Sequence, residues 1–238
     1  MKMNRIRLRT EWVLVALLAL ATPACSTFQY RQVQSDFEEA VLADNAQLNP
    51  VIDRSEELYR EVAGTLTAER IAELDPKLRA NAWMVRSFSE WRSGQLTKAR
   101  DSAKAGLEAK PVANSRDDVL LHLIPALVID SEVMDAWVNS GRQTDPVEYE
   151  TSQEGDFGTA IEKVDEAKGR ISPATPPSTA YYVEYQRWRI LQNWREVIKN
   201  IPDARRAERI AARSRAKVDG KTLDQAAKES RDAIPNAH

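Results

Sequence analysis

The stretch AWMVRSFSEWRSGQLTKARDSAKAGLEAKP, residues 82–111, carries the most informative pattern in the sequence. Before Gly94 large apolar residues recur at helical spacing, and after it small residues do the same. Gly94 permits a tight turn between two helices, and Pro111 ends the second of them. The stretch therefore predicts an antiparallel pair of helices.

The second of these helices carries small residues on one stripe, which lets its partner helix approach closely. With a tryptophan eleven residues before the turn glycine, the pattern resembles the tetratricopeptide (TPR) repeat, a 34-residue helix–turn–helix unit. In the first helix the apolar stripe departs from the family pattern, which prefers leucine and tyrosine where Arg86 and Glu90 stand. The residues that carry the resemblance are Trp83, Gly94, Ala99, Ala103, Gly106 and Pro111.

Two further segments echo this unit. A similar spacing of apolar and small residues is found in SDFEEAV, at Phe37, Ala40 and Val41, and again from Phe157 in GDFGTAIEKV. The alanines at 40, 99 and 160 are 59 and 61 residues apart, which is short of two full repeats. We therefore expect a partly degenerate helical array, an α-solenoid or right-handed superhelix. An unrelated α-bundle is the alternative.

The rest of the chain has helical periodicity and only eight glycines, which predicts an all-α fold. We expect a polar connector over residues 141–154, a rigid linker over 173–178 and no strand. A TPR-like domain would cover 25–172, and a C-terminal helical extension over 173–238 would pack on it. The expected helices span 29–45, 55–66, 76–93, 96–109, 117–139 (one or two helices, interrupted near Pro125 or Asp130), 157–170, 179–201, 203–217 and 221–233, with a short one from Thr67.

The first 24 residues read as a secretory signal: a basic head, a short apolar run and small residues at the exit. Cys25, the single cysteine, follows this run. The stretch resembles the lipobox of bacterial lipoproteins, which implies cleavage before Cys25 and its lipidation. Ser26 is not the aspartate that marks inner-membrane retention, so the resemblance implies the periplasmic side of the outer membrane. Ordinary cleavage after Ala24 or an uncleaved anchor are the alternatives.

Charge and residue spacing exclude several classes of function. Without the signal, 30 basic and 35 acidic residues remain, which argues against a nucleic-acid partner. One cysteine allows no intramolecular disulfide, and His122 and His238 lie too far apart in sequence to form a metal-ligand motif. Nucleophile-elbow and phosphate-loop motifs are absent from the sequence. We therefore predict no enzyme activity, no metal and no cofactor.

The TPR resemblance implies a concave face that binds peptides or proteins. By the family pattern, this partner-binding groove is lined by Asn81, Met84, Phe88, Trp91 and Arg92. The alternative is that Met84, Phe88 and Trp91 pack as core against residues 53–74.

The helix expected over 179–201 carries two apolar faces. One presents Tyr181, Tyr185 and Trp188, and the other includes Trp194. Core packing explains both faces, unless one is left free for a partner. Ten basic residues lie between 186 and 217. They form a solvated helix surface, or they face anionic lipid or an acidic partner.

These observations predict a lipid-anchored periplasmic scaffold that binds a protein partner in a cell-envelope complex. One alternative is an exported enzyme, or a subunit of one, that acts on the cell wall, which would need converging carboxylates. Another is a small-ligand carrier with an aromatic pocket lined by Trp188, Trp194 or Trp91.

Overall fold

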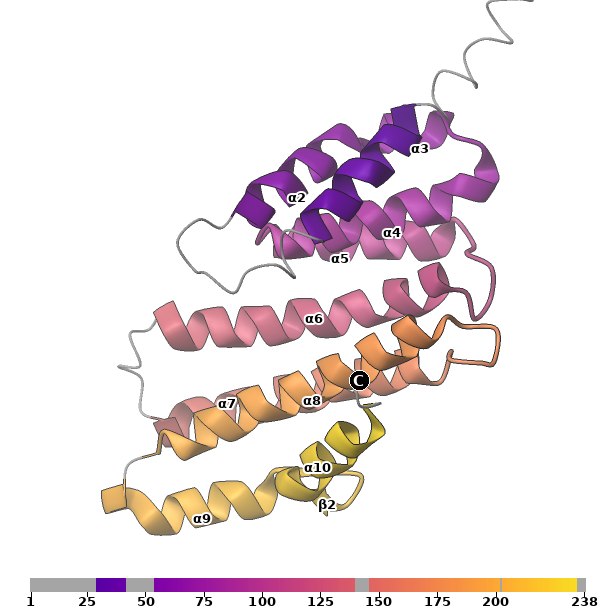
Figure 1. Ribbon diagram of the computed structural model, residues 1–238. Helices are drawn as coiled ribbons and strands as arrows, with labels where there is room; N and C mark the ends of the chain where they lie inside the picture. Colours follow the sequence, from indigo (N-terminus) through magenta and orange to yellow (C-terminus); the bar gives the residue numbers. More distant parts are fainter. Residues whose placement is uncertain (1–28, 42–53, 140–145, 202, 235–238) are drawn as a thin grey trace, which may run out of the picture.

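The computed structural model describes residues 29–41, 54–139, 146–201 and 203–234. These residues are almost wholly helical, which confirms the predicted all-α helical array (Figure 1). The predicted signal segment and Cys25 lie outside the described residues.

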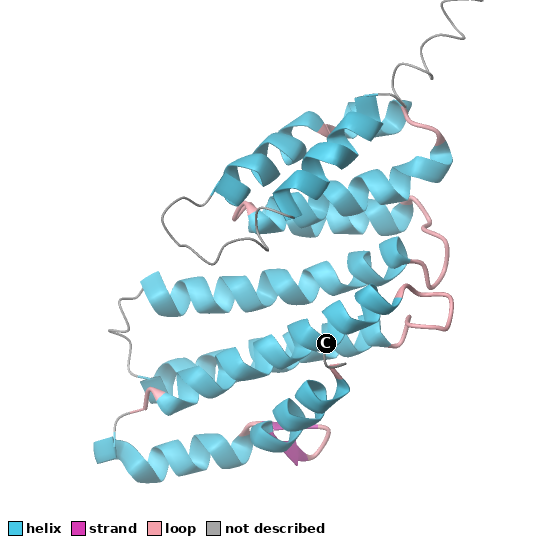
Figure 2. Cartoon of the chain, viewed as in Figure 1, coloured by secondary structure: helices cyan, strands magenta, loops and turns pink. Residues whose placement is uncertain are grey.

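The helices follow one another with short connections. Residues 29–41 are helical and precede the first labelled helix. Between the last two helices lies a two-stranded hairpin, β1 (Lys217–Val218) and β2 (Lys221–Thr222), and a 3-10 turn, η1 (Asp203–Arg205), precedes α9 (Figure 2). The helices are α2 (Arg54–Thr65), α3 (Ala68–Glu73), α4 (Pro76–Arg92), α5 (Leu96–Glu108), α6 (Arg116–Asn139), α7 (Pro146–Lys168), α8 (Pro177–Lys199), α9 (Arg206–Arg215) and α10 (Leu223–Ala233).

The helices stack in chain order. Each helix from α4 to α8 packs on the next, and α2, α4, α6 and α8 also contact one another in that order. In Figure 1 the stack runs from the 29–41 helix and α2 at the top to α9 and α10 at the bottom. One cluster of buried apolar residues extends along the whole stack, from Tyr30 to Ala227.

The α4–α5 pair forms as its sequence predicts. The Asp75 side chain caps the start of α4, with Pro76 at the first helical position. Gly94, at φ +74°, makes the turn in a conformation that favours glycine. At Gly106 the helices come so close that an added Cβ would lie 2.5 Å from Leu121 Cδ2 and 3.0 Å from the Trp83 Cβ.

The three alanines at the repeated spacing lie in similar environments. Ala40, Ala99 and Ala160 are all fully buried, each in a different helix. Small residues at these positions fit close packing between neighbouring helices. The array is thus established, and its assignment to a particular repeat type stays a prediction.

Three details differ from the predictions. Helix α6 runs unbroken through Pro125. Helix α7 begins at Pro146, so the predicted connector over 141–154 is wrong from that residue on. The β1–β2 hairpin was not predicted, since each strand has only two residues. Among the described residues, no helix combines the length and hydropathy that a membrane span requires.

Helices α9 and α10 pack on the end of the array formed by α7 and α8. Helix α10 packs on α8, and α9 contacts α7 and α8. The buried Arg187 of α8 donates to Asp165 of α7 at 2.8 Å and to Ser230 of α10 at 2.8 Å. It also lies 3.6 Å from Asp219 in the hairpin turn. One guanidinium therefore ties three elements to α8.

Candidate functional site

The predicted groove on α4 is largely filled by the protein itself. Met84 is 1% exposed and Trp91 is 5% exposed, so both belong to the core. The prediction that these two residues line an open groove is therefore corrected: other helices of the array cover them. Asn81, Phe88 and Arg92 are half-buried, and their role in binding a partner stays a prediction.

Aromatic side chains close the space around Phe88. Its ring lies 5.7 Å from that of Phe37, 6.1 Å from Tyr59 and 6.1 Å from Tyr182, measured between centroids. These rings come from the 29–41 helix, α2 and α8. These aromatic contacts join segments that are far apart in sequence, as contacts in a hydrophobic core do.

The Asn81 side chain also makes hydrogen bonds to other residues of the chain. Its Oδ1 accepts hydrogen bonds from Tyr30 and from Gln34, and its Nδ2 donates to Asp117 at 2.8 Å. It thereby links the 29–41 helix, α4 and α6. Burial raises the pKa of Asp117 above its usual range.

A second polar cluster joins α4, α6 and α8. The buried Asp130 accepts from Arg189 at 3.1 Å and from Asn193 at 2.9 Å. The Arg189 guanidinium lies 5.5 Å from the centre of the Trp91 ring, whose Nε1 donates to Ser131 at 3.0 Å. Burial raises the pKa of Asp130, although Arg189 and Asn193 act in the opposite direction.

Helix α8 leaves one face partly exposed. Tyr181 and Tyr185 are each 37% exposed and stack with a centroid distance of 6.5 Å. Trp188 continues the row, 5.9 Å from Tyr185. The same face goes on with Gln192, Arg195 and Lys199, because the six positions alternate steps of four and three residues. We call these six residues the α8 stripe.

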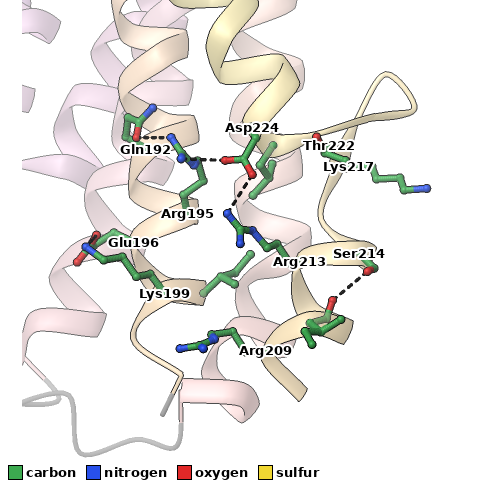
Figure 3. A pocket seen from close by; sticks show the side chains of 13 residues that line it. Gln192, Arg195, Glu196, Lys199, Arg209, Arg213, Ser214, Lys217, Thr222 and Asp224 are labelled. Atoms are coloured by element: carbon green, nitrogen blue, oxygen red, sulfur yellow. Dashed lines mark hydrogen bonds and ion pairs between the residues drawn. The ribbon is translucent and has the colours of Figure 1, made fainter. Parts of the chain in front are cut away.

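The polar half of the α8 stripe leads into a cleft of about 840 Å³ between α8, α9 and the start of α10, which we call the α8–α9 cleft (Figure 3). Ile210, on its α9 wall, is 56% exposed. The cleft is lined by Gln192, Arg195, Glu196, Ile198, Lys199, Arg209, Ile210, Arg213, Ser214, Lys217, Thr222, Leu223 and Asp224.

Two arginines in this cleft share one carboxylate. Asp224, in the first turn of α10, lies 2.8 Å from Arg195 of α8 and 3.0 Å from Arg213 of α9 (Figure 3). Thr222 caps α10 with a capping box and so fixes the position of Asp224. Two positive charges around a single negative charge leave this end of the cleft electropositive.

The other end of the α8–α9 cleft holds Lys199 and Arg209. Lys199 contacts Glu196 of its own helix at 3.4 Å. Arg209 is paired with Asp203, and its Nη1 donates to the Ile201 carbonyl at 3.3 Å. Five basic residues and two acidic ones line the cleft, and in Figure 3 Lys217 points away from the other four cations.

The two hydroxyl groups that line this cleft are engaged within the protein. Ser214 donates its hydroxyl to the Ile210 carbonyl at 2.9 Å, and Thr222 is engaged in capping. Within the described ranges, His, Asp and Glu side chains form no group that could hold a metal ion.

A second, smaller cleft of about 390 Å³ lies among α2, α3, α4 and α5. Its buried Glu90 accepts from Arg86 Nε at 2.8 Å. Neither cleft is lined by a tryptophan. Trp194, one of the residues proposed for an aromatic pocket, is buried and stacked on Phe157 at 5.5 Å.

Comparisons of the chain with known protein families, curated proteins and solved structures find no match. The site must therefore be interpreted from its own geometry.

Proposed function

We propose that this protein is a lipid-anchored periplasmic scaffold that docks a protein partner on the α8 stripe and the α8–α9 cleft. One observation carries the proposal. A row of partly exposed aromatic side chains on α8 continues, on the same helix face, into a cationic cleft. Aromatic and arginine side chains are the residue types that most often anchor protein–protein interfaces.

The α8 stripe also extends along most of helix α8. From Tyr181 to Lys199 it covers 19 residues, or about 27 Å at the rise of an α-helix. The Asp130–Arg189 pair and the Arg187 contacts hold α8 rigidly in the array. A rigid face loses little conformational entropy when it binds.

Site-specific photocrosslinking tests the docking. The full-length chain would carry a photoreactive phenylalanine analogue at Tyr185, in cells that export it. A matched control places the analogue at Val112, which is 79% exposed and lies outside the α8 stripe. A discrete protein adduct at 185 and its absence at 112 support the proposal. Equal labelling at both positions, or no protein adduct at 185, contradicts it.

The tether requires a separate test, because Cys25 lies outside the described residues. The mass of the N-terminal peptide from the native membrane fraction distinguishes the possibilities. A mass that fits acylated Cys25 supports the anchor, since each buried methylene contributes about 0.8 kcal/mol to membrane binding. An unmodified start near Cys25 contradicts the anchor, and a peptide that begins at Met1 or Lys2 contradicts cleavage.

A further inference from the structure

We propose that the partner segment is an acidic amphipathic helix that lies in the α8–α9 cleft and along the α8 stripe. This inference rests on the proposed function and gives the chemistry of the partner. It follows from how four of the cleft cations are placed. Arg195 and Lys199 are four residues apart on α8, and Arg209 and Arg213 are four residues apart on α9.

The two pairs line opposite walls of the α8–α9 cleft. In Figure 3 Arg195 lies near Arg213 at one end, and Lys199 and Arg209 lie toward the other. Side chains four residues apart on a helix are neighbours on its surface. A helix that lies over the mouth of the cleft can therefore present carboxylates at the same spacing toward each wall.

The cleft also offers a place for apolar residues. Ile210 lines it and is 56% exposed, with the buried Ile198 and Leu223 beside it, and Tyr185 and the partly buried Trp188 extend the apolar surface along α8. A partner helix with one apolar stripe and two acidic flanks matches this arrangement, which is the helix-in-groove mode of recognition. The shared Asp224 leaves Arg195 and Arg213 with capacity for a second carboxylate.

A lipid surface fits this site less well. The four cations line a hollow, and a flat bilayer surface would meet only its rim. Lys199, whose side chain is 78% exposed, reaches solvent freely, while Arg209 is held by Asp203 and the Ile201 carbonyl. A convex acidic helix can enter the cleft between them.

Fluorescence anisotropy with the full-length protein tests this inference. The probe is a labelled synthetic helix with a leucine stripe and glutamates four residues apart on both flanks. A matched peptide has lysine at every glutamate position. We expect the acidic peptide to bind at least about tenfold more tightly than the basic one, with an affinity that falls as salt rises.

Two variants locate the binding. Lys199→Glu combined with Arg213→Gln removes one cation from each wall. We expect this double variant to bind the acidic peptide about tenfold more weakly, or weaker still. Lys104→Glu, at an exposed position on α5, is the charge control and leaves binding unchanged. Circular dichroism confirms that both variants fold.

The remaining outcomes overturn the inference. Equal binding of the two peptides, no binding of either, or equal effects of the two variants each exclude an acidic helix in the cleft. Tighter binding to anionic vesicles than to the acidic peptide assigns the cations to lipid instead. If the Tyr185 crosslink forms while the acidic peptide fails, only the partner chemistry is wrong. If the crosslink itself is absent, the docking function fails.

Discussion

Gly106 on α5 lies where three helices meet. An added Cβ would contact Leu121 of α6 and Trp83 of α4, and Leu121 is fully buried. Overpacking costs about 1–3 kcal/mol, while alanine favours a helix over glycine by about 1 kcal/mol. We expect Gly106→Ala to lower the free energy of unfolding by up to about 2 kcal/mol in urea titrations.

Gly158 on α7 provides the control for this prediction. Its missing Cβ faces open space, so Gly158→Ala should raise the free energy of unfolding by about 1 kcal/mol. A stabilising effect at both positions would show that the α4–α5–α6 contact does not require glycine.

Asp130 predicts a pH dependence of stability. Its folded-state pKa is raised by burial, so the folded chain binds this proton more readily than the unfolded chain. The stability that the protonated Asp130 carboxyl contributes is therefore fully present below the unfolded-state pKa. It is lost as the pH rises through the folded-state pKa. We expect Asp130→Asn to cost more stability at about pH 4 than at about pH 8. A larger cost at the higher pH would contradict the assignment.

At the scale of single elements, helix α6 keeps a proline in its interior. Proline removes a backbone hydrogen bond and is unfavourable inside a helix by about 3 kcal/mol. Because α6 runs unbroken through Pro125, packing on its neighbours compensates for this cost. We expect Pro125→Ala to raise the melting temperature and the free energy of unfolding by about 1 kcal/mol or more. A loss of stability would mean that α6 needs the proline to fit its neighbours.

The sequence predicts those elements whose signals are local. The start of α4 follows from Asp75-Pro76, and the α4–α5 turn follows from Gly94. The first part of α7 is polar, so its helix cannot be recognised from apolar periodicity. Pro125 likewise suggested a break that tertiary packing prevents. Local signals fix the ends of an element, and contacts with other helices decide whether a weak segment folds.

The candidate site depends on the whole molecule. Arg195, Arg213 and Asp224 come from three helices, and only the fold brings them together. The sequence showed an excess of basic residues in this region without placing them around a cleft. It also left open whether Phe88 and Trp91 are core. Trp91 is buried and belongs to the core. Phe88 is half-buried among rings from the 29–41 helix, α2 and α8, and its role in binding a partner stays a prediction.

Arg187 holds the C-terminal elements to the array, and its removal should release them. Breaking a buried ion pair costs about 3–5 kcal/mol, and Asp165 is partly exposed, so we expect Arg187→Met to cost about 2–3 kcal/mol. Hydrogen exchange should rise in α9, β1, β2 and α10 more than in α4 and α5. Arg100→Met, at an exposed pair with Glu132, should cost less than about 1 kcal/mol. Uniform exchange across the chain would contradict this role for Arg187.

The proposed function requires that a protein cover the α8 stripe in the cell envelope. Hydroxyl-radical footprinting measures this directly, by comparing the oxidation of Tyr181 and Tyr185 in isolated envelopes with that in the purified protein. Val112, exposed and outside the stripe, is the internal reference. We predict that both tyrosines are protected in envelopes while Val112 is oxidised equally in the two samples. Equal oxidation of the tyrosines in both samples would contradict the claim.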